Sequence, residues 1–158
     1  MSNEKVGINV DELCHALEDF SFAFEHYLDL RTGKILFISD FVGDTEEEKE
    51  KIEKDARRYA YIPKTDVQEG YQDMSDFIGS VEDEDLQRIL KISLNGKGAF
   101  RRFKDALIDF PMEEEMWFNF KDRRTRRRAL GLLEDLGLVF DEDQTEDAEI
   151  RWCYPKSP

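Results

Sequence analysis

Two clusters of basic residues have the types and spacing that could bind a phosphate. The first follows a glycine pair and contributes Lys97, Arg101, Arg102 and Lys104. The backbone N–H groups and the positive dipole end of a helix that begins after Gly98 favour an anion. The stretch lacks the spacing and the terminal Lys-Ser/Thr of a phosphate-binding loop. A turn between two helices, with Arg101 paired to Asp105, explains the same residues without a ligand.

The second cluster spans 121–128 and has six basic residues in eight, including Arg123, Arg124 and Arg127. In an unbroken helix Arg126 would share the core-facing arc with Ala129 and Leu133. The sequence therefore predicts that the helix breaks or that Arg126 finds a carboxylate. Two interpretations stay open: arginines that contact phosphates without reading a base sequence, and an internal network with nearby carboxylates.

Aromatic residues precede the second cluster in the stretch Trp117-Phe118-Asn119-Phe120. Aromatic and basic side chains together are typical of proteins that bind single-stranded nucleic acids. On a helix such rings more often face the core, so we expect at least two of the three to pack inward, against Phe100 and Phe103.

The sequence offers little for catalysis. It has two histidines and two cysteines, and His26 lies on the apolar face of a predicted strand. Cys14 and His15 are neighbours that a helix would point about 100° apart, which does not favour a nucleophile or metal pair. We predict no catalytic residue, no metal ligand and no cofactor.

Length and charge set the class of protein. A chain of 158 residues suits one domain over 1–158. The net charge of −14 is uneven, because 96–128 carries +4 and the remainder carries −18. An acidic body repels phosphates over about 10 Å, which argues against nucleic acids. The absence of a long apolar run or a leader pattern predicts a cytoplasmic protein without a membrane anchor.

The first half of the chain predicts a helix through Asp19 and then a hairpin. Strict alternation over 20–30 indicates a half-buried strand, followed by a turn at 31–34 and a strand at 35–38. Thr45 and Glu48 have the spacing of a capping box for a helix to Arg58, with Ile52 and Ala56 in the core. A short strand should follow at 59–62.

The second half predicts mainly helices. They begin near residues 66, 83, 98 and 111, and the second of them should bury Ile89. A flexible acidic loop near 141–149 and a final strand at 150–154, returning to the sheet, complete the chain. The fold class is α+β, a small antiparallel sheet that includes the N-terminal hairpin, with a mostly helical second half.

Several fragments resemble one uncharacterised bacterial protein family of unknown function. They are Tyr27-Leu28-Asp29-Leu30 with Thr32-Gly33, the signature Gly98-Ala99-Phe100-Arg101-Arg102-Phe103-Lys104-Asp105, Trp117-Phe118-Asn119-Phe120, and Arg128-Ala129 before Leu133-Glu134-Asp135-Leu136-Gly137. The resemblance spans about two-thirds of the chain. It implies a bacterial cytosolic domain and assigns no catalytic residue.

Three functions follow as hypotheses. The preferred one is a non-enzymatic interaction or regulatory domain with a protein partner, which meets the acidic body or Arg101, Arg102 and Lys104. The second is binding of RNA or a phosphate-containing ligand through the basic 97–128 region. The third is an enzyme that uses carboxylates and a divalent metal.

Overall fold

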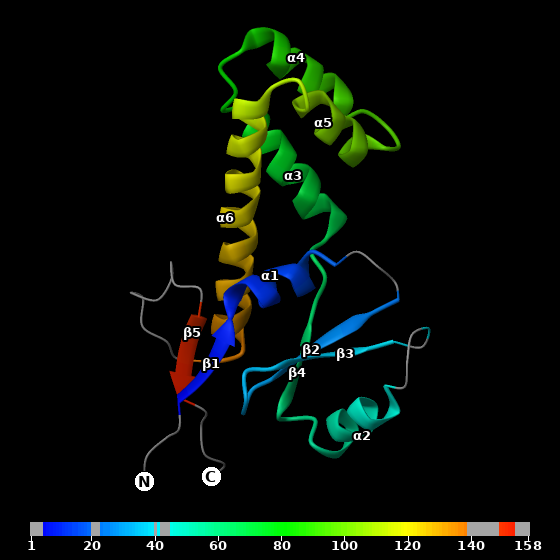
Figure 1. Cartoon of the computed structure of the whole chain (residues 1–158), viewed down its shortest axis with the longest axis vertical. Helices are drawn as coiled ribbons and strands as arrows, with labels where there is room; N and C mark the ends of the chain where they lie inside the picture. The colour runs from blue at the N-terminus through cyan, green and yellow to red at the C-terminus, as the bar shows by residue number, and fades with distance from the viewer. Residues whose placement is uncertain (1–4, 20–22, 40, 42–44, 139–148, 154–158) are drawn as a thin grey trace. The chain divides into compact units, whose positions relative to one another are not determined.

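Strands and helices mix in the first half of the chain, and the second half is mostly helical (Figure 1). The structure is a computed structural model that describes residues 5–19, 23–39, 41, 45–138 and 149–153. Its elements are β1 (Lys5–Asn9), α1 (Val10–Leu17), β2 (Glu25–Asp29), β3 (Ile35–Ile38), α2 (Glu46–Lys54), β4 (Tyr59–Ile62), α3 (Val67–Ile78), α4 (Glu84–Ser93), α5 (Ala99–Leu107), α6 (Pro111–Asp135) and β5 (Glu149–Cys153). The predicted α+β class is confirmed.

The chain divides into two units. Residues 1–65 and 125–158 form the first unit, and 66–124 form the second. The single domain over 1–158 stays a prediction. Among the described helices, none combines the length and the apolar character needed to cross a membrane.

The first unit contains an antiparallel sheet in the order β3-β2-β4. The predicted hairpin is its β2–β3 half, in which Leu28 faces Ile35. Gly33 turns the chain with a φ of 78°, where a residue with a Cβ would be strained, and its N–H donates to the Asp29 carbonyl at 2.7 Å. Strand β2 begins at Glu25. The strand predicted from residue 20 is therefore shorter in the structure, and 20–22 lie outside the described residues.

A second, two-stranded sheet pairs β1 with β5 in antiparallel register, Gly7 opposite Arg151. The final strand is confirmed, but the expectation that it returns to the hairpin sheet was wrong. Its partner β1 was not predicted, because five residues that include a lysine and a glycine carry little alternation. The acidic segment 141–149 lies outside the described residues except for Glu149, which begins β5.

The pleat of the three-stranded sheet separates a core face from an outer face. On the core face Leu28 and Ile62 are fully buried in a cluster with Leu13, Ala129 and Leu133. The outer face carries the alternate residues of the same strands. They are Glu25, Tyr27 and Asp29 of β2, Leu36 and Ile38 of β3, and Tyr59 and Tyr61 of β4.

A side chain at the start of helix α2 bonds to the end of the sheet. The Thr45 hydroxyl donates to the Ser39 carbonyl at 2.9 Å and accepts the Ser39 N–H at 3.3 Å. The predicted capping box is therefore wrong, because Thr45 makes no side-chain cap to its own helix. The helix ends at Lys54 and buries no residue. Ala56, predicted for the core, is exposed in the turn that follows.

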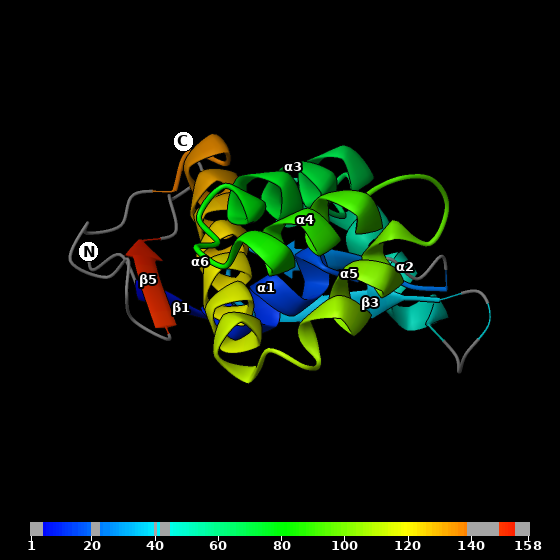
Figure 2. The ribbon, with the colours of Figure 1, turned by 90° about the horizontal axis from the view of Figure 1, so that it is seen from above.

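The second unit consists of α3, α4, α5 and the first part of α6, which lie side by side (Figure 2). Their core contains the aromatic rings of Phe77, Phe103 and Trp117. Phe103 lies 4.8 Å from Trp117 and 6.3 Å from Phe77, centroid to centroid, in edge-to-face geometry. Trp117 and Phe120 pack in this cluster and Phe118 is 46% exposed, which confirms that at least two of the three rings face inward. Ile89, predicted to be buried, is 45% exposed.

The signature at 98–105 builds the corner between α4 and α5. Gly98 has a φ of 78° before α5, and Ala99 and Phe103 are buried. The Arg102 guanidinium donates to the carbonyls of Ser93, Asn95, Gly96 and Lys97, so it caps the end of α4 and the turn after it. Gly98, Phe103 and Arg102 therefore stabilise the fold of this corner.

We expect Gly98→Ala to destabilise the protein by about 1–2 kcal/mol, because a left-handed conformation is costly for a residue with a Cβ. The added Cβ would also lie 3.2 Å from Nη1 of Arg102. Urea denaturation measures the effect. Gly131→Ala is the matched control, since its Cβ would meet nothing within 4 Å in helix α6, and it should stabilise by about 0.5–1 kcal/mol. Equal effects of the two changes would contradict this account of the corner.

Candidate functional site

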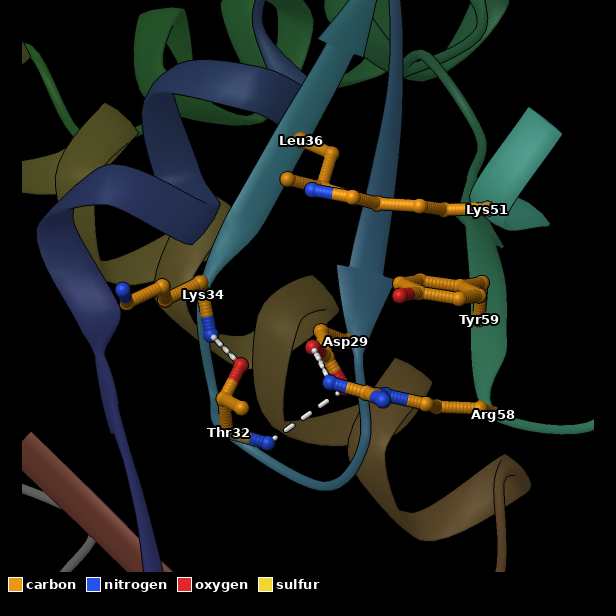
Figure 3. Close-up of a pocket in the computed structure, with 7 residues that line it drawn as sticks. All are labelled: Asp29, Thr32, Lys34, Leu36, Lys51, Arg58 and Tyr59. Carbon is orange, nitrogen blue, oxygen red and sulfur yellow. Dashed lines mark hydrogen bonds and ion pairs between the residues drawn. The ribbon is translucent and has the colours of Figure 1, made fainter. Parts of the chain in front are cut away.

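A pocket of about 380 Å³ opens on the outer face of the three-stranded sheet (Figure 3). All of its lining belongs to the first unit. The lining residues are Asp29, Thr32, Lys34, Leu36, Lys51, Arg58 and Tyr59. Three are cationic and one is a carboxylate, so the lining has a net charge of +2 in a chain whose net charge is −14.

The floor of the pocket is an ion pair between Asp29 and Arg58. Nε of Arg58 donates to Oδ1 and Nη2 donates to Oδ2, each at 2.8 Å, which is a bidentate geometry. The N–H groups of Arg31 and Thr32 also donate to Oδ1, at 3.0 and 3.4 Å. Asp29 is 5% exposed, and its carboxylate is occupied by four donors.

Backbone bonds hold the pair in place from both strands. The Asp29 N–H donates to the Lys34 carbonyl across the hairpin at 2.8 Å, and the Leu30 N–H donates to the Arg58 carbonyl at 2.8 Å. The Arg58 guanidinium also lies 5.2 Å from the centre of the Tyr59 ring, a cation–π contact. The guanidinium is therefore fixed in orientation.

Both members of the pair stay charged. Burial by itself would raise the pKa of Asp29, but hydrogen bonds from Arg58, Thr32 and Arg31 together with the Arg58 charge outweigh it and lower the pKa. The hydrogen bond to Asp29 in turn raises the pKa of Arg58 above its usual value. Asp29 is consequently unsuited to take a proton as a general base near neutral pH.

Lys51 supplies a second cation from α2. Its side chain crosses toward Leu36, and Figure 3 shows the side chains of Lys51, Tyr59 and Arg58 extending in the same direction, with Tyr59 between the other two. Nζ of Lys51 lies 3.9 Å from Glu47 Oε1, and the lysine side chain is 53% exposed. An exposed pair of this kind holds the lysine weakly. The Lys34 side chain points away from Lys51 in the same view.

The basic residues singled out in the sequence lie outside this pocket. Arg124 is engaged inside the second unit, with Nη2 3.0 Å from Asp76, Nη1 3.8 Å from the buried Asp73, and its guanidinium over the Phe120 ring at 4.8 Å. This favours the internal-network interpretation for Arg124, and the four carbonyls bound by Arg102 give that residue a structural role as well.

The other five predicted site residues are exposed. Arg101 pairs with Asp105 at 3.9 Å, as its spacing predicted, and its side chain is 89% exposed. The remaining four are Lys97 and Lys104 near α5, and Arg123 and Arg127 on α6. Helix α6 runs unbroken through Arg126, which is half-buried. Of the two predicted alternatives the break is therefore wrong, and a carboxylate partner for Arg126 stays a prediction.

Sequence reasoning missed the residues that line the pocket. Asp29 and Arg58 are 29 positions apart, and Lys51 appeared as one charge of a surface helix. One signal was present: Asp29 ends a strand just before Thr32-Gly33, a pattern in which an aspartate accepts N–H groups of the following turn. The fragments carrying the family resemblance include these three residues.

A second cavity in the first unit, of about 490 Å³, is lined by Glu12, His15, Ala16, Asp19, His26 and Ile35. His26 Nδ1 lies 3.8 Å from Asp19 Oδ2, and this buried nitrogen makes no hydrogen bond. Burial lowers the pKa of His26, partly offset by the Asp19 charge. In the described part of the chain no three metal-ligating side chains come together. We therefore take the Asp29–Arg58 pocket as the candidate site.

We expect Asp29→Asn to destabilise the protein by about 2–3 kcal/mol near neutral pH, because it leaves a partly buried guanidinium without its charge partner. Asp105→Asn, which breaks the exposed pair with Arg101, is the control and should cost no more than about 0.5 kcal/mol. Chemical denaturation of both variants provides the comparison.

The effect of Asp29→Asn should depend on pH. Since folding lowers the pKa of Asp29, its stabilisation is present above the unfolded value of about 3.9 and is lost as pH falls through the folded value. The difference between wild type and Asp29→Asn should therefore shrink below about pH 4. A difference that stays constant from pH 6 down to acid unfolding would refute the charged pair.

Comparison with known proteins places the chain in a family. The model of the uncharacterised protein family UPF0158 matches residues 5–151. The chain is 32% identical to a UPF0158 protein of Pseudomonas aeruginosa over 128 residues, which cover 81% of this chain and 82% of that protein. It is also 32% identical to a UPF0158 protein of Chlamydia pneumoniae over 125 residues, 75% of this chain but 38% of the longer relative. No solved structure matches. The chain therefore belongs to the UPF0158 family.

Proposed function

We propose that this protein is a non-enzymatic, cytoplasmic binding domain that takes up a small anionic ligand in the Asp29–Arg58 pocket. The observation that carries the proposal is the local charge: a lining of +2, with its arginine locked in place, within a strongly acidic chain. Cations that gather around a pocket repel one another, and a bound anion would stabilise them.

Within a few ångströms of a bound anion, the cations of the pocket act on it more strongly than distant exposed carboxylates do. A unit charge about 4 Å from an ammonium gains roughly 1 kcal/mol in water and roughly 4 kcal/mol at the effective dielectric of a protein surface. Exposed carboxylates farther away than about 8 Å are largely screened at physiological salt. An anion beside Lys51 and Arg58 meets those two cations and the Tyr59 hydroxyl, which can donate a hydrogen bond. Two carboxylates lie within the same distance: Asp29, already bound to Arg58, and the exposed Glu47, 3.9 Å from Lys51 Nζ, which an anion would have to outcompete.

The chemistry of the pocket favours binding over catalysis. Its carboxylate is saturated by four donors and has a lowered pKa, so it is poorly placed to move protons. The remaining polar side chains are two lysines, a guanidinium and two hydroxyls. Of these groups, Lys51, the guanidinium of Arg58 and the Tyr59 hydroxyl point the same way and are suited to neutralise and orient an anion, which is the task of a ligand-binding or regulatory domain.

Inorganic phosphate is the simplest probe for the pocket. We expect it to shift the NMR resonances of Arg58 Nε–H and of the Tyr59 backbone, and we expect Lys51→Gln to weaken this binding by about fivefold or more. Lys54→Gln is the matched control, because it removes the same charge from the exposed end of the same helix without touching the pocket. Equal losses in both variants, or no shift in the wild type, would overturn the proposal.

A second proposal keeps the protein-partner hypothesis for α5. The exposure of Arg101 and Lys104, one turn apart on that helix, favours a partner with an acidic face. A pull-down from native cytosol at low salt should recover a protein with wild type and lose it with the double change Arg101→Glu and Lys104→Glu. Recovery that is unaffected by the double change would contradict this role for α5.

A further inference from the structure

The outer face of the sheet continues from the pocket into a pair of tyrosines. Tyr27 of β2 and Tyr61 of β4 are cross-strand partners, with ring centroids 5.4 Å apart and planes inclined by 62°. Tyr27 is half-buried, whereas Tyr61 is 46% exposed. One aromatic ring is thus held by its neighbour and turned toward solvent.

The register places these rings directly beside the pocket. Tyr61 is two residues from Tyr59 on β4, which puts it on the same face at a distance of about 7 Å along the strand. Tyr27 is likewise two residues from Asp29 on β2, and it pairs with the pocket residue Leu36 across the hairpin. A ligand bound at Lys51 and Arg58 therefore has an aromatic platform next to it.

The tyrosines are not part of a core in the first unit. Its hydrophobic cluster lies on the opposite face of the sheet, around Leu28 and Ile62. Burial, followed by the charge of Glu25 and the neighbouring Tyr61, raises the pKa of Tyr27, so its phenol is neutral at physiological pH. On this face the cations lie at the pocket end, and the carboxylate of Glu25 lies two residues from Tyr27 on the side away from the pocket.

We propose that the ligand is a free nucleotide whose base stacks on Tyr61 while its phosphate meets Lys51 and Arg58. This inference rests on the proposed function, because it uses the same cationic pocket and names the class of anion. Base–aromatic stacking accepts any base and adds affinity that inorganic phosphate cannot gain. The combination distinguishes a nucleotide from other small anions.

The charge around the site favours a free nucleotide over a nucleic acid strand. A strand needs a track of cations along its backbone. Here the lining offers three cations, and the first turn of α2 presents Glu46, Glu47 and Glu48. The pocket volume of about 380 Å³ lies in the range typical of small-molecule sites.

Isothermal titration with four probes tests the inference: adenosine monophosphate, adenosine, inorganic phosphate and an eight-residue oligoadenylate. We expect the monophosphate to bind about tenfold tighter than phosphate, and adenosine to bind more weakly than the monophosphate. Tyr61→Leu should remove the advantage of the monophosphate while leaving phosphate binding unchanged.

Phe37→Leu is the matched control, since it removes another exposed ring, 51% exposed, from the opposite face of the same sheet. It should leave all four affinities unchanged. Retained phosphate binding and an unchanged circular dichroism spectrum show that Tyr61→Leu is folded. If Tyr61→Leu fails to fold, the ring-proton NMR resonances of Tyr61 in the wild-type protein are the readout: we expect them to shift on adding the monophosphate and not on adding inorganic phosphate, and equal responses to the two would refute the stacking.

The outcomes separate the two proposals. Phosphate binding that needs Lys51, with no advantage for the monophosphate, would refute the nucleotide and leave the anion site standing. No binding of phosphate or monophosphate would refute both. Oligoadenylate that binds tighter per nucleotide, with an affinity falling steeply as salt rises, would replace the free nucleotide with a single strand.

Discussion

The buried carboxylate of Asp29 and the guanidinium of Arg58 hold together the end of β2, the turn after it and the residue that precedes β4. Taking two charges out of water is costly, and the pair is stable only because four donors satisfy the carboxylate and the guanidinium keeps part of its surface in solvent. The same contacts fix one edge of the pocket. Folding and the candidate chemistry therefore depend on one ion pair.

Within the segment 98–105, three residues shape the fold. Gly98 permits the turn, Phe103 fills the core of the second unit, and Arg102 closes the end of α4. The charge at Arg102 thus replaces missing helical hydrogen bonds instead of meeting a partner. A basic residue in a turn between two helices can donate hydrogen bonds to backbone carbonyls of that turn, so its presence does not by itself indicate a site for an external anion.

The spacing of apolar residues predicted most helices and the hairpin, because the period of 3.6 residues for a helix and of 2 for a strand can be recognised in a short stretch of sequence. They could not predict that Asp29 is buried. Alternation assigns a strand residue to one face of the sheet, but it does not identify the residue that pairs with it, and Arg58 lies 29 positions later in the chain. The pairing of β1 with β5 was missed for the same reason, as it joins opposite ends of the chain. The sequence did not reveal the pocket, because α2, β2, β3 and β4 each contribute only one of its residues and the other three, Thr32, Lys34 and Arg58, lie in the turns between them.

Helix α2 carries Lys51 yet buries no side chain, and Thr45 bonded to Ser39 links its start to the sheet. A segment with so little apolar contact opens locally at a much lower free energy than the strands beside it, and its amide protons should exchange early. An anion held between Lys51 and Arg58 would join this helix to the ion pair that links β2 and β4. Binding in the pocket would then slow the exchange of amide protons along α2, while exchange in the hydrophobic core would stay unchanged.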